Sequence, residues 1–165
     1  TSGAGVAAEQ CLAGEAWVRD GVRFEFLHPD GSPYDDNAGS CVLRVQAGPR
    51  AALFTGDIPA AVEASLPPEA LRADLVIVPH HGSRTSSSAA LVDAAGARWA
   101  AVSAGHSNRW GFPKPDVVAR WQAAGSRVTN TADAGALVFE IGPRGARGGR
   151  GERERVPRWW RAGPD

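Results

Sequence analysis

An α/β layered domain is the fold class that the sequence predicts, and three observations predict it. Short unbroken apolar runs occur at 51–54 and 75–78, and a third mainly apolar stretch occurs at 99–103; stretches of this length suit strands that are buried on both faces of a sheet. A helical pattern follows each run, so strands and helices alternate from the middle of the chain onward. The length of 165 residues, with 43% hydrophobic and 22% charged residues, fits one globular domain.

The first part of the domain is expected to consist of β-strands. A strand over 17–22 enters an Asp-Gly turn, and a second strand follows at 23–27. Pro, Asp, Asn and Gly make 28–40 a polar loop, within which 35–37 has the composition of a turn rather than of a cation site. The partly alternating, β-branched pattern at 41–46 predicts the next strand.

Proline, serine and glycine mark the ends of the predicted helices. The first and third helices begin at a proline, the second follows serines that can cap its first turn, and the third ends at a glycine. These helices are predicted at 59–66, 89–95 and 115–124. Each lies between two predicted strands, and the last strands are expected at 128–129 and 136–141.

The two ends of the chain are expected to lie outside this domain. Residues 1–14 are rich in Gly and Ala and are predicted to be a loose segment, while the domain itself extends over 15–142. The Arg/Gly-rich stretch 143–165 is predicted to be a tail that builds no core. Because this tail also contains tryptophans, it is either a solvated segment or one that binds single strands by charge and stacking.

Charge, hydropathy and cysteine content limit the possible functions. The formal net charge is zero, so any contact with DNA must come from local patches. No apolar run approaches the roughly 18 residues that cross a bilayer, and no signal peptide is visible, so a soluble chain is expected. The first residue is Thr1 and Met is absent, which favours a piece of a longer protein. Cys11 and Cys41 are either two unpaired buried thiols or one disulfide formed in an oxidising compartment.

Two polar segments that directly follow predicted buried strands carry the candidate chemistry. One ends in Asp57, and the other contains His80 and His81. Functional groups of α/β proteins gather at the carboxyl ends of strands, and a carboxylate there is costly unless it is paired or coordinates a metal. One imidazole can ligate a metal while the other handles protons. We therefore expect Asp57 and His81 to be catalytic, and the candidate metal ligands are Asp57, His80 and His81.

Side chains near these segments are candidates for holding an anionic substrate. Ser83 and Thr85 offer hydroxyl groups, and Arg84 offers a positive charge. After the third apolar run, Asn108 and Arg109 are expected to contact a phosphate, because a guanidinium pairs with phosphate through two hydrogen bonds. The aromatic side chains of the same loop are either a hydrophobic plug or the frame of the active-site mouth; they are Trp110 and Phe112.

These segments, in this order, resemble the metallo-β-lactamase-type domain of ComEC-type competence proteins. The resemblance covers about residues 11–141 and is most specific over 79–88. It implies the C-terminal half of an αββα sandwich, a binuclear hydrolase fold in which Asp57 bridges two divalent ions, zinc or manganese, and His80 or His81 completes one metal site. It also implies a DNase acting in DNA uptake during natural transformation, on the periplasmic side of a bacterial inner-membrane protein.

The sequence departs from the family pattern in its ligand set. The H-x-H-x-D-H motif is absent, and the spacing of the histidines at 28, 80, 81 and 106 does not replace it. The chain thus supplies two or three ligands, and we expect it to hold none or one ion, to leave one sheet face uncovered and to lack activity by itself. The implied partners are single-stranded DNA, the N-terminal half of the same domain and a transmembrane channel region. A smaller departure is Phe112, which stands where some relatives carry His.

Other functions remain open at this level. A degenerate domain that has lost its metal site would instead be a non-catalytic module that handles single-stranded DNA through Arg84, Arg109 and the arginines of the tail. The segment around His80 and His81 also resembles that of lactonases and phosphorylcholine esterases of the same fold. No small-molecule organic cofactor is expected in any of these cases.

Overall fold

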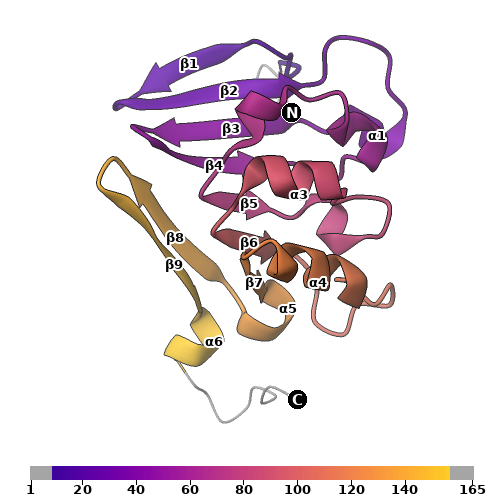
Figure 1. Ribbon diagram of the computed structural model, residues 1–165, viewed down its shortest axis with the longest axis vertical. Helices are drawn as coiled ribbons and strands as arrows, with labels where there is room; N and C mark the ends of the chain where they lie inside the picture. Colours follow the sequence, from indigo (N-terminus) through magenta and orange to yellow (C-terminus); the bar gives the residue numbers. More distant parts are fainter. Residues whose placement is uncertain (1–8, 157–165) are drawn as a thin grey trace, which may run out of the picture.

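A seven-stranded mixed sheet organises the computed structural model, which describes residues 9–156 (Figure 1). The strands follow one another across the sheet in sequence order. The first four strands pair antiparallel, and the pairs from the fourth to the seventh strand are parallel. The strands are β1 (Ala16–Arg19), β2 (Val22–His28), β3 (Val42–Ala47), β4 (Arg50–Phe54), β5 (Leu75–Ile77), β6 (Trp99–Val102) and β7 (Arg127–Asn130). The predicted α/β layered fold class is confirmed.

Helices cover one face of this sheet (Figure 1). The longer ones are α3 (Ala89–Ala95) and α4 (Pro115–Ala123), and α1 (Ala60–Glu63) and α2 (Pro68–Leu71) are single turns. Burial of apolar side chains between the two layers is the main stabilising contribution to such a core. This core includes Leu53, Val76, Ala100, Leu91, Val92 and Trp121.

Local hydrogen bonds explain where the helices begin and end. The hydroxyl of Ser88 accepts a hydrogen bond from the Leu91 amide at 3.2 Å, so the predicted serine cap of α3 is confirmed. Helix α1 is shorter than the predicted 59–66. The Ser65 hydroxyl donates to the Val62 carbonyl at 2.8 Å and so competes with the backbone bonds that would extend the helix.

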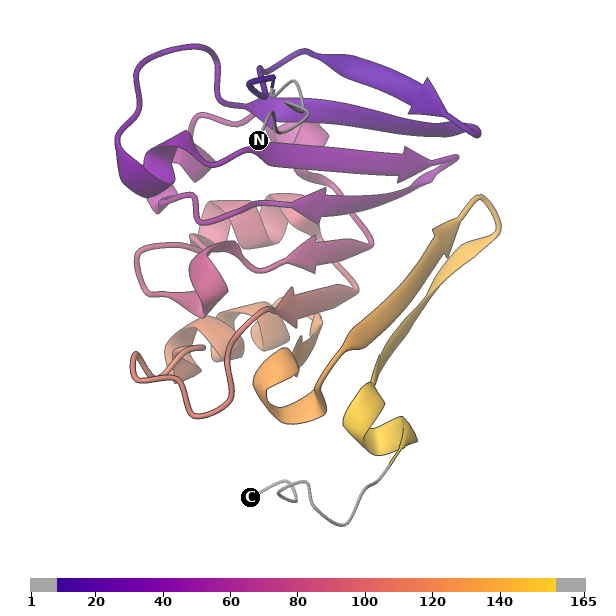
Figure 2. The same cartoon turned by 180° about the vertical axis from the view of Figure 1, so that it is seen from behind.

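A hairpin of β8 (Leu137–Gly142) and β9 (Gly145–Gly151) lies on the other side of the sheet (Figure 2). The prediction of a tail from residue 143 is therefore wrong for β9 and for the following turn α6 (Glu152–Arg155). The glycines that suggested a tail make close packing possible, since a Cβ at Gly148 would overlap the Val138 carbonyl oxygen. Residues 157–165 lie outside the described residues.

The hairpin covers only part of the sheet face. Its side chains Phe139, Ile141 and Ala146 pack on residues of β4, β5 and β6. The cross-strand register places another aromatic group on the same face, towards β1. We call it the aromatic face; it consists of Trp17, Phe24, Phe26 and Phe54. Trp17 is 44% exposed, so the expectation of an uncovered sheet face is confirmed for this part.

The N-terminal segment is fastened to the sheet rather than loose where the structure describes it. Cys11 forms a disulfide with Cys41, which decides between the two alternatives for the cysteines. Ala13 also donates a backbone hydrogen bond to Pro29 at 2.7 Å. The prediction of a loose segment is thus wrong for residues 11–14, and residues 1–8 lie outside the described part. No helix of the described residues is long and apolar enough to cross a membrane.

Candidate functional site

Three loops meet at one edge of the sheet because β4, β5 and β6 are parallel. Asp57 follows β4, the turn Pro79–Gly82 follows β5, and residues 103–114 follow β6. Hydrogen bonds join the first two loops, since the Thr55 hydroxyl donates to the Ile77 carbonyl at 2.6 Å and the His80 amide donates to the Gly56 carbonyl at 3.1 Å. The sequence prediction that Asp57 and the histidine pair lie together is confirmed.

His81 and Asp57 face each other across a short gap. The distance from His81 Nε2 to Asp57 Oδ2 is 3.6 Å, and both side chains are partly exposed. The other ring nitrogen, Nδ1, lies 2.7 Å from the Ser103 carbonyl oxygen, which can only accept, so Nδ1 carries a proton. Two states satisfy this arrangement: a protonated ring paired with the carboxylate, or a neutral ring and the carboxylate with a cation between them.

His80 is held differently from His81. Its Nε2 lies 3.3 Å from the Asn37 amide nitrogen, which donates, and its Nδ1 lies 3.3 Å from the Thr85 hydroxyl. The Thr85 hydroxyl is in turn 3.0 Å from the hydroxyl of buried Ser83. Both ring nitrogens of His80 therefore have protein partners, whereas Nε2 of His81 is directed at Asp57.

The backbone of the histidine turn has an uncommon conformation. His80, His81 and Gly82 all have positive φ values of 50°, 57° and 81°, which is costly for residues with a Cβ and is typical of functional sites. The two imidazole planes consequently lie 70° apart. The turn is held from the next loop, because the Lys114 amide donates to the Gly82 carbonyl at 2.9 Å and Pro113 packs directly on Gly82.

A buried carboxylate supports the segment that follows the histidines. Glu63 is only 3% exposed, and it accepts hydrogen bonds from the amides of Ser87 at 2.6 Å and Ser88 at 2.7 Å. The indole of Trp121 donates to the Ser87 hydroxyl at 3.2 Å. Sequence reasoning missed Glu63, because an acidic residue in a predicted short helix carries no sign of burial.

The polar loop between β2 and β3 also reaches the site, which sequence reasoning missed. Besides Asn37, it contributes Ser40, whose hydroxyl accepts from the Asp57 amide at 3.2 Å. The loop is anchored by buried His28, whose Nε2 lies 2.7 Å from the Ala38 carbonyl oxygen. The turn composition of 35–37 was a correct signal for the local structure, but it contained no information about this long-range contact.

The loop after β6 forms a wall next to His81. The Asn108 side chain closes this loop, because its amide donates to the Phe112 carbonyl at 2.8 Å and its oxygen accepts from the Phe112 amide at 2.8 Å. The Phe112 ring packs beside both imidazoles, with centroid distances of 5.9 Å to His80 and 6.3 Å to His81. Trp110 is 58% exposed, so the interpretation of this residue as a hydrophobic plug is wrong.

The predicted substrate-binding residues do not converge on one point. The Arg84 guanidinium binds the Asp116 carboxylate at 3.0 Å, and Arg109 lies over the Trp110 ring at 4.4 Å. Ser83 and Thr85 belong to the hydrogen-bond chain of His80, and the Asn108 amide is engaged within its own loop. Contact of these residues with a substrate stays a prediction.

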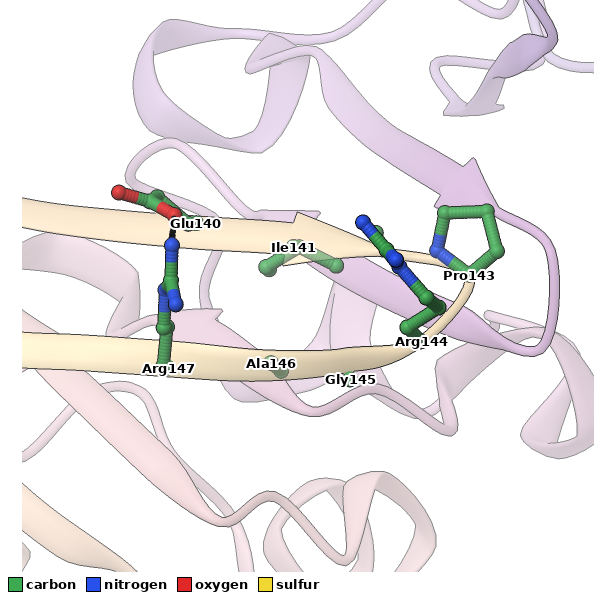
Figure 3. Close-up of a pocket in the computed structure, with 8 residues that line it drawn as sticks. Glu140, Ile141, Pro143, Arg144, Gly145, Ala146 and Arg147 are labelled. Atoms are coloured by element: carbon green, nitrogen blue, oxygen red, sulfur yellow. Dashed lines mark hydrogen bonds and ion pairs between the residues drawn. The ribbon is translucent and has the colours of Figure 1, made fainter.

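One hollow in the described part of the structure adjoins the histidines. A cavity of about 360 Å³ is lined by His81, Ser103, Ala104, Gly105, Asn108, Trp110 and Phe112. A second hollow of about 470 Å³ lies at the tip of the β8–β9 hairpin, where Arg147 pairs with Glu140 (Figure 3). Pro143 at this tip packs against Gly48, which lies in the turn between β3 and β4, at the sheet edge opposite Asp57.

The donor set fits part of a metal site. Among residues 9–156, no group of three or more His, Cys, Asp or Glu side chains is placed to hold a metal ion. Asp57 and His81 supply one oxygen and one nitrogen donor, which are ligand types that zinc and manganese accept. Zinc sites have about four ligands, so these two residues account for one side of such a site.

Comparison with known proteins identifies relatives along most of the chain, although no family model matches it. Competence protein ComA of Neisseria gonorrhoeae is 40% identical over 144 residues, covering 85% of this chain. The uncharacterized protein YcaI of Escherichia coli is 35% identical over 156 residues, covering 92%. Recombination protein 2 of Haemophilus influenzae is 36% identical over 126 residues, covering 76%. This chain belongs to the ComEC-type competence protein family.

The resemblance noted from the sequence is thereby confirmed at the level of the family. The chain spans 21%, 21% and 16% of the lengths of these three relatives. The matched stretches cover between 76% and 92% of this chain, and any continuous stretch of that length includes the loops that carry Asp57 and the two histidines.

Proposed function

We propose that this chain supplies Asp57 and His81 to the two-metal site of a metallo-β-lactamase-type hydrolase domain, and that the complete domain is a DNase serving DNA uptake. The observation that carries the proposal is the contact of 3.6 Å between His81 Nε2 and Asp57 Oδ2. The carbonyl of Ser103 fixes the opposite ring nitrogen, as the outer partner of a metal-ligating histidine does.

The chain's own residues have separate tasks in this proposal. Asp57 and His81 hold the ions, while His80 is a positioning residue whose ring is fixed by Asn37 and Thr85. A divalent ion in such a site makes hydroxide available near neutral pH and polarises a phosphoryl oxygen. The Ser40 hydroxyl accepts a hydrogen bond from the Asp57 amide, and this bond holds the backbone from which the carboxylate faces His81.

The aromatic face is a suitable contact surface for the other half of the domain, which is the first partner that we propose. Exposed aromatic groups on one sheet face are costly in water and mark a contact surface. A second sheet packed face to face would cover Trp17, Phe24, Phe26 and Phe54 and would complete an αββα sandwich. We infer that the N-terminal half of the domain supplies this sheet together with the remaining metal ligands.

The disulfide supports a location outside the cytoplasm. Disulfides persist in oxidising compartments such as the bacterial periplasm and are rare in the cytosol. The bond between Cys11 and Cys41 therefore agrees with a domain on the periplasmic side of an inner-membrane protein. Single-stranded DNA and a transmembrane channel region of the longer protein are the partners that this location would bring together.

Cleavage assays on the longer protein that contains the whole domain test the proposed function. With added Mn²⁺ or Zn²⁺, it should cleave a single-stranded oligonucleotide, and Asp57→Ala and His81→Ala should each lower the rate at least as much as loss of an outer-sphere partner does, about 10–100-fold. Asp93→Ala, which removes an exposed carboxylate of α3, is the matched control. Equal cleavage by the Asp57→Ala variant and the unsubstituted protein would contradict the proposal.

A second candidate function is a non-catalytic module that binds single-stranded DNA. It is favoured by one observation: the described residues contain two facing donors but no cluster of three metal ligands. This alternative predicts salt-sensitive binding without turnover even when the whole domain and both metals are present. The two functions are separated by measuring both binding and cleavage of the same oligonucleotide. Binding without any metal-dependent product supports the non-catalytic module.

A further inference from the structure

The cavity beside His81 has a wall that the proposed metal chemistry does not explain. Trp110 lines this cavity and is 58% exposed. Such exposure is unusual for a large aromatic side chain. Arg109 lies 4.4 Å from the centre of the indole ring, as in a cation–π pair. Because the tryptophan is still largely exposed, the guanidinium leaves much of the ring uncovered.

The loop presents Trp110 on a fixed backbone. Asn108 bonds to both backbone groups of Phe112, and the Lys114 ammonium donates to the Trp110 carbonyl at 2.5 Å. Near the start of this loop, the Thr131 hydroxyl donates to the Ala104 carbonyl and accepts from the Ala104 amide, both at 2.9 Å. A rigid aromatic surface loses little conformational entropy when a flat ligand stacks on it.

Size and charge narrow the class of ligand. The volume of about 360 Å³ lies at the lower end of small-molecule sites, which favours a single flat ring system with its sugar. The cations of Arg109 and Lys114 lie beside the two aromatic rings, at 4.4 Å from Trp110 and 5.2 Å from Phe112. A flat ring joined to an anion satisfies both features of this wall, and a nucleotide has that chemistry.

We propose that the cavity is a nucleobase subsite, in which Trp110 stacks on one base of a single strand and Arg109 lies near the adjacent phosphate. The proposal rests on the proposed function, since it places a strand next to Asp57 and His81. The proposal adds that stacking on Trp110 holds the strand, and not hydrogen bonds to the edges of its bases. The Asn108 amide, the lining group best suited to such hydrogen bonds, is already bonded within the loop.

Stacking predicts binding that is tolerant of sequence, because every base offers a flat face. Oligothymidylate and oligodeoxyadenylate should therefore bind this chain with similar affinity. An oligonucleotide of the same length and charge with abasic sugars should bind much more weakly. A subsite that recognised the phosphate alone would not distinguish the abasic strand from the normal one.

Binding of fluorescent octanucleotides to the 165-residue chain tests the subsite, in a chelator so that no metal takes part. Base–aromatic stacking contributes about 1–3 kcal/mol per base, so Trp110→Ala should weaken binding of oligothymidylate about 5- to 160-fold. The same substitution should leave the weak binding of the abasic strand unchanged. Trp17→Ala, which removes another exposed tryptophan on the aromatic face, is the matched control and should keep the affinity within about twofold.

Two outcomes would overturn the subsite. One is unchanged affinity of Trp110→Ala for oligothymidylate, and the other is an equal loss for the normal and abasic strands, which would assign the effect to the phosphate. Because this measurement uses no metal, its failure is distinct from failure of the proposed hydrolase. Loss of cleavage in Asp57→Ala together with unaltered binding by Trp110→Ala would keep the hydrolase and reject the subsite.

Discussion

His81 is oriented by Ser103, whose carbonyl oxygen lies 2.7 Å from the imidazole Nδ1. Ser103 directly follows β6, so a strand of the central sheet determines where Nε2 of this histidine points. His80 is instead hydrogen-bonded to Asn37 and Thr85, which lie in loops. Two adjacent histidines thus have different environments, and this difference leads to separate expectations for their substitution.

We expect His81→Ala to abolish metal binding by the whole domain and His80→Gln to weaken it about 10–100-fold, the range for partners outside the ligand set. The reason is that Nε2 of His81 faces Asp57, whereas both ring nitrogens of His80 are engaged. Competition for zinc against a chromophoric chelator measures both affinities, and His106→Gln serves as the control. Greater loss in His80→Gln than in His81→Ala would reverse the assignment.

Gly82→Ala tests the packing of the histidine turn. A Cβ at this position would lie 2.6 Å from the Cβ of Pro113, and φ is 81°. Gly125 is the matched control, because its φ is 89° while nothing lies within 4 Å of an added Cβ. Gly125→Ala should cost about 1 kcal/mol of unfolding free energy from the left-handed backbone alone. Gly82→Ala should cost a further 1–3 kcal/mol or so from overpacking.

Urea unfolding of the two glycine variants gives both free energies under one set of conditions. Equal losses would mean that the loop after β6 yields to the added methyl group. In that case Pro113 would not hold the histidine turn, and the close approach between these two loops would have no structural role.

Parts of this site were predictable from sequence, and the reason is topological. Parallel strands present their carboxyl ends at the same edge, so short apolar runs followed by Asp57 and by the histidine pair were enough to bring those residues together. Asn37 and Ser40 were not predictable in this way. They belong to a loop between antiparallel strands, whose path depends on the buried ring of His28 and on the Cys11–Cys41 disulfide.

The hairpin strand β9 was missed for a different reason. The prediction of a tail was based on the small apolar surface that Gly and Arg side chains can bury. This is correct for the Gly and Arg residues of β9. The strand instead gains backbone hydrogen bonds with β8, which carries the apolar residues Phe139 and Ile141. A glycine-rich strand is stable here because its partner supplies the buried surface.

Glu63→Gln should destabilise the segment behind the histidines. The buried carboxylate accepts from the amides of Ser87 and Ser88, and glutamine would offer one oxygen and would turn an N–H group towards the other amide. Loss of a buried hydrogen bond to a charged group costs about 1.5–3 kcal/mol. The exposed residue Glu69 provides the control Glu69→Gln, which should change stability by less than about 0.5 kcal/mol. Unfolding in urea gives both values, and a neutral Glu63→Gln would show that this loop does not depend on the carboxylate.

Phe112→His is expected to strengthen metal binding by the whole domain. The Phe112 ring lies beside both imidazoles, at centroid distances of 5.9 Å to His80 and 6.3 Å to His81. A third imidazole there would add a nitrogen donor next to His81 and Asp57, and zinc binds through such sets of three or four ligands. Chelator competition should show tighter zinc binding for Phe112→His and no gain for Phe112→Leu, which keeps the apolar contact without a donor. Equal affinities of the two variants would mean that position 112 points away from the ions, and the metal site would then have to be completed entirely by residues beyond this loop.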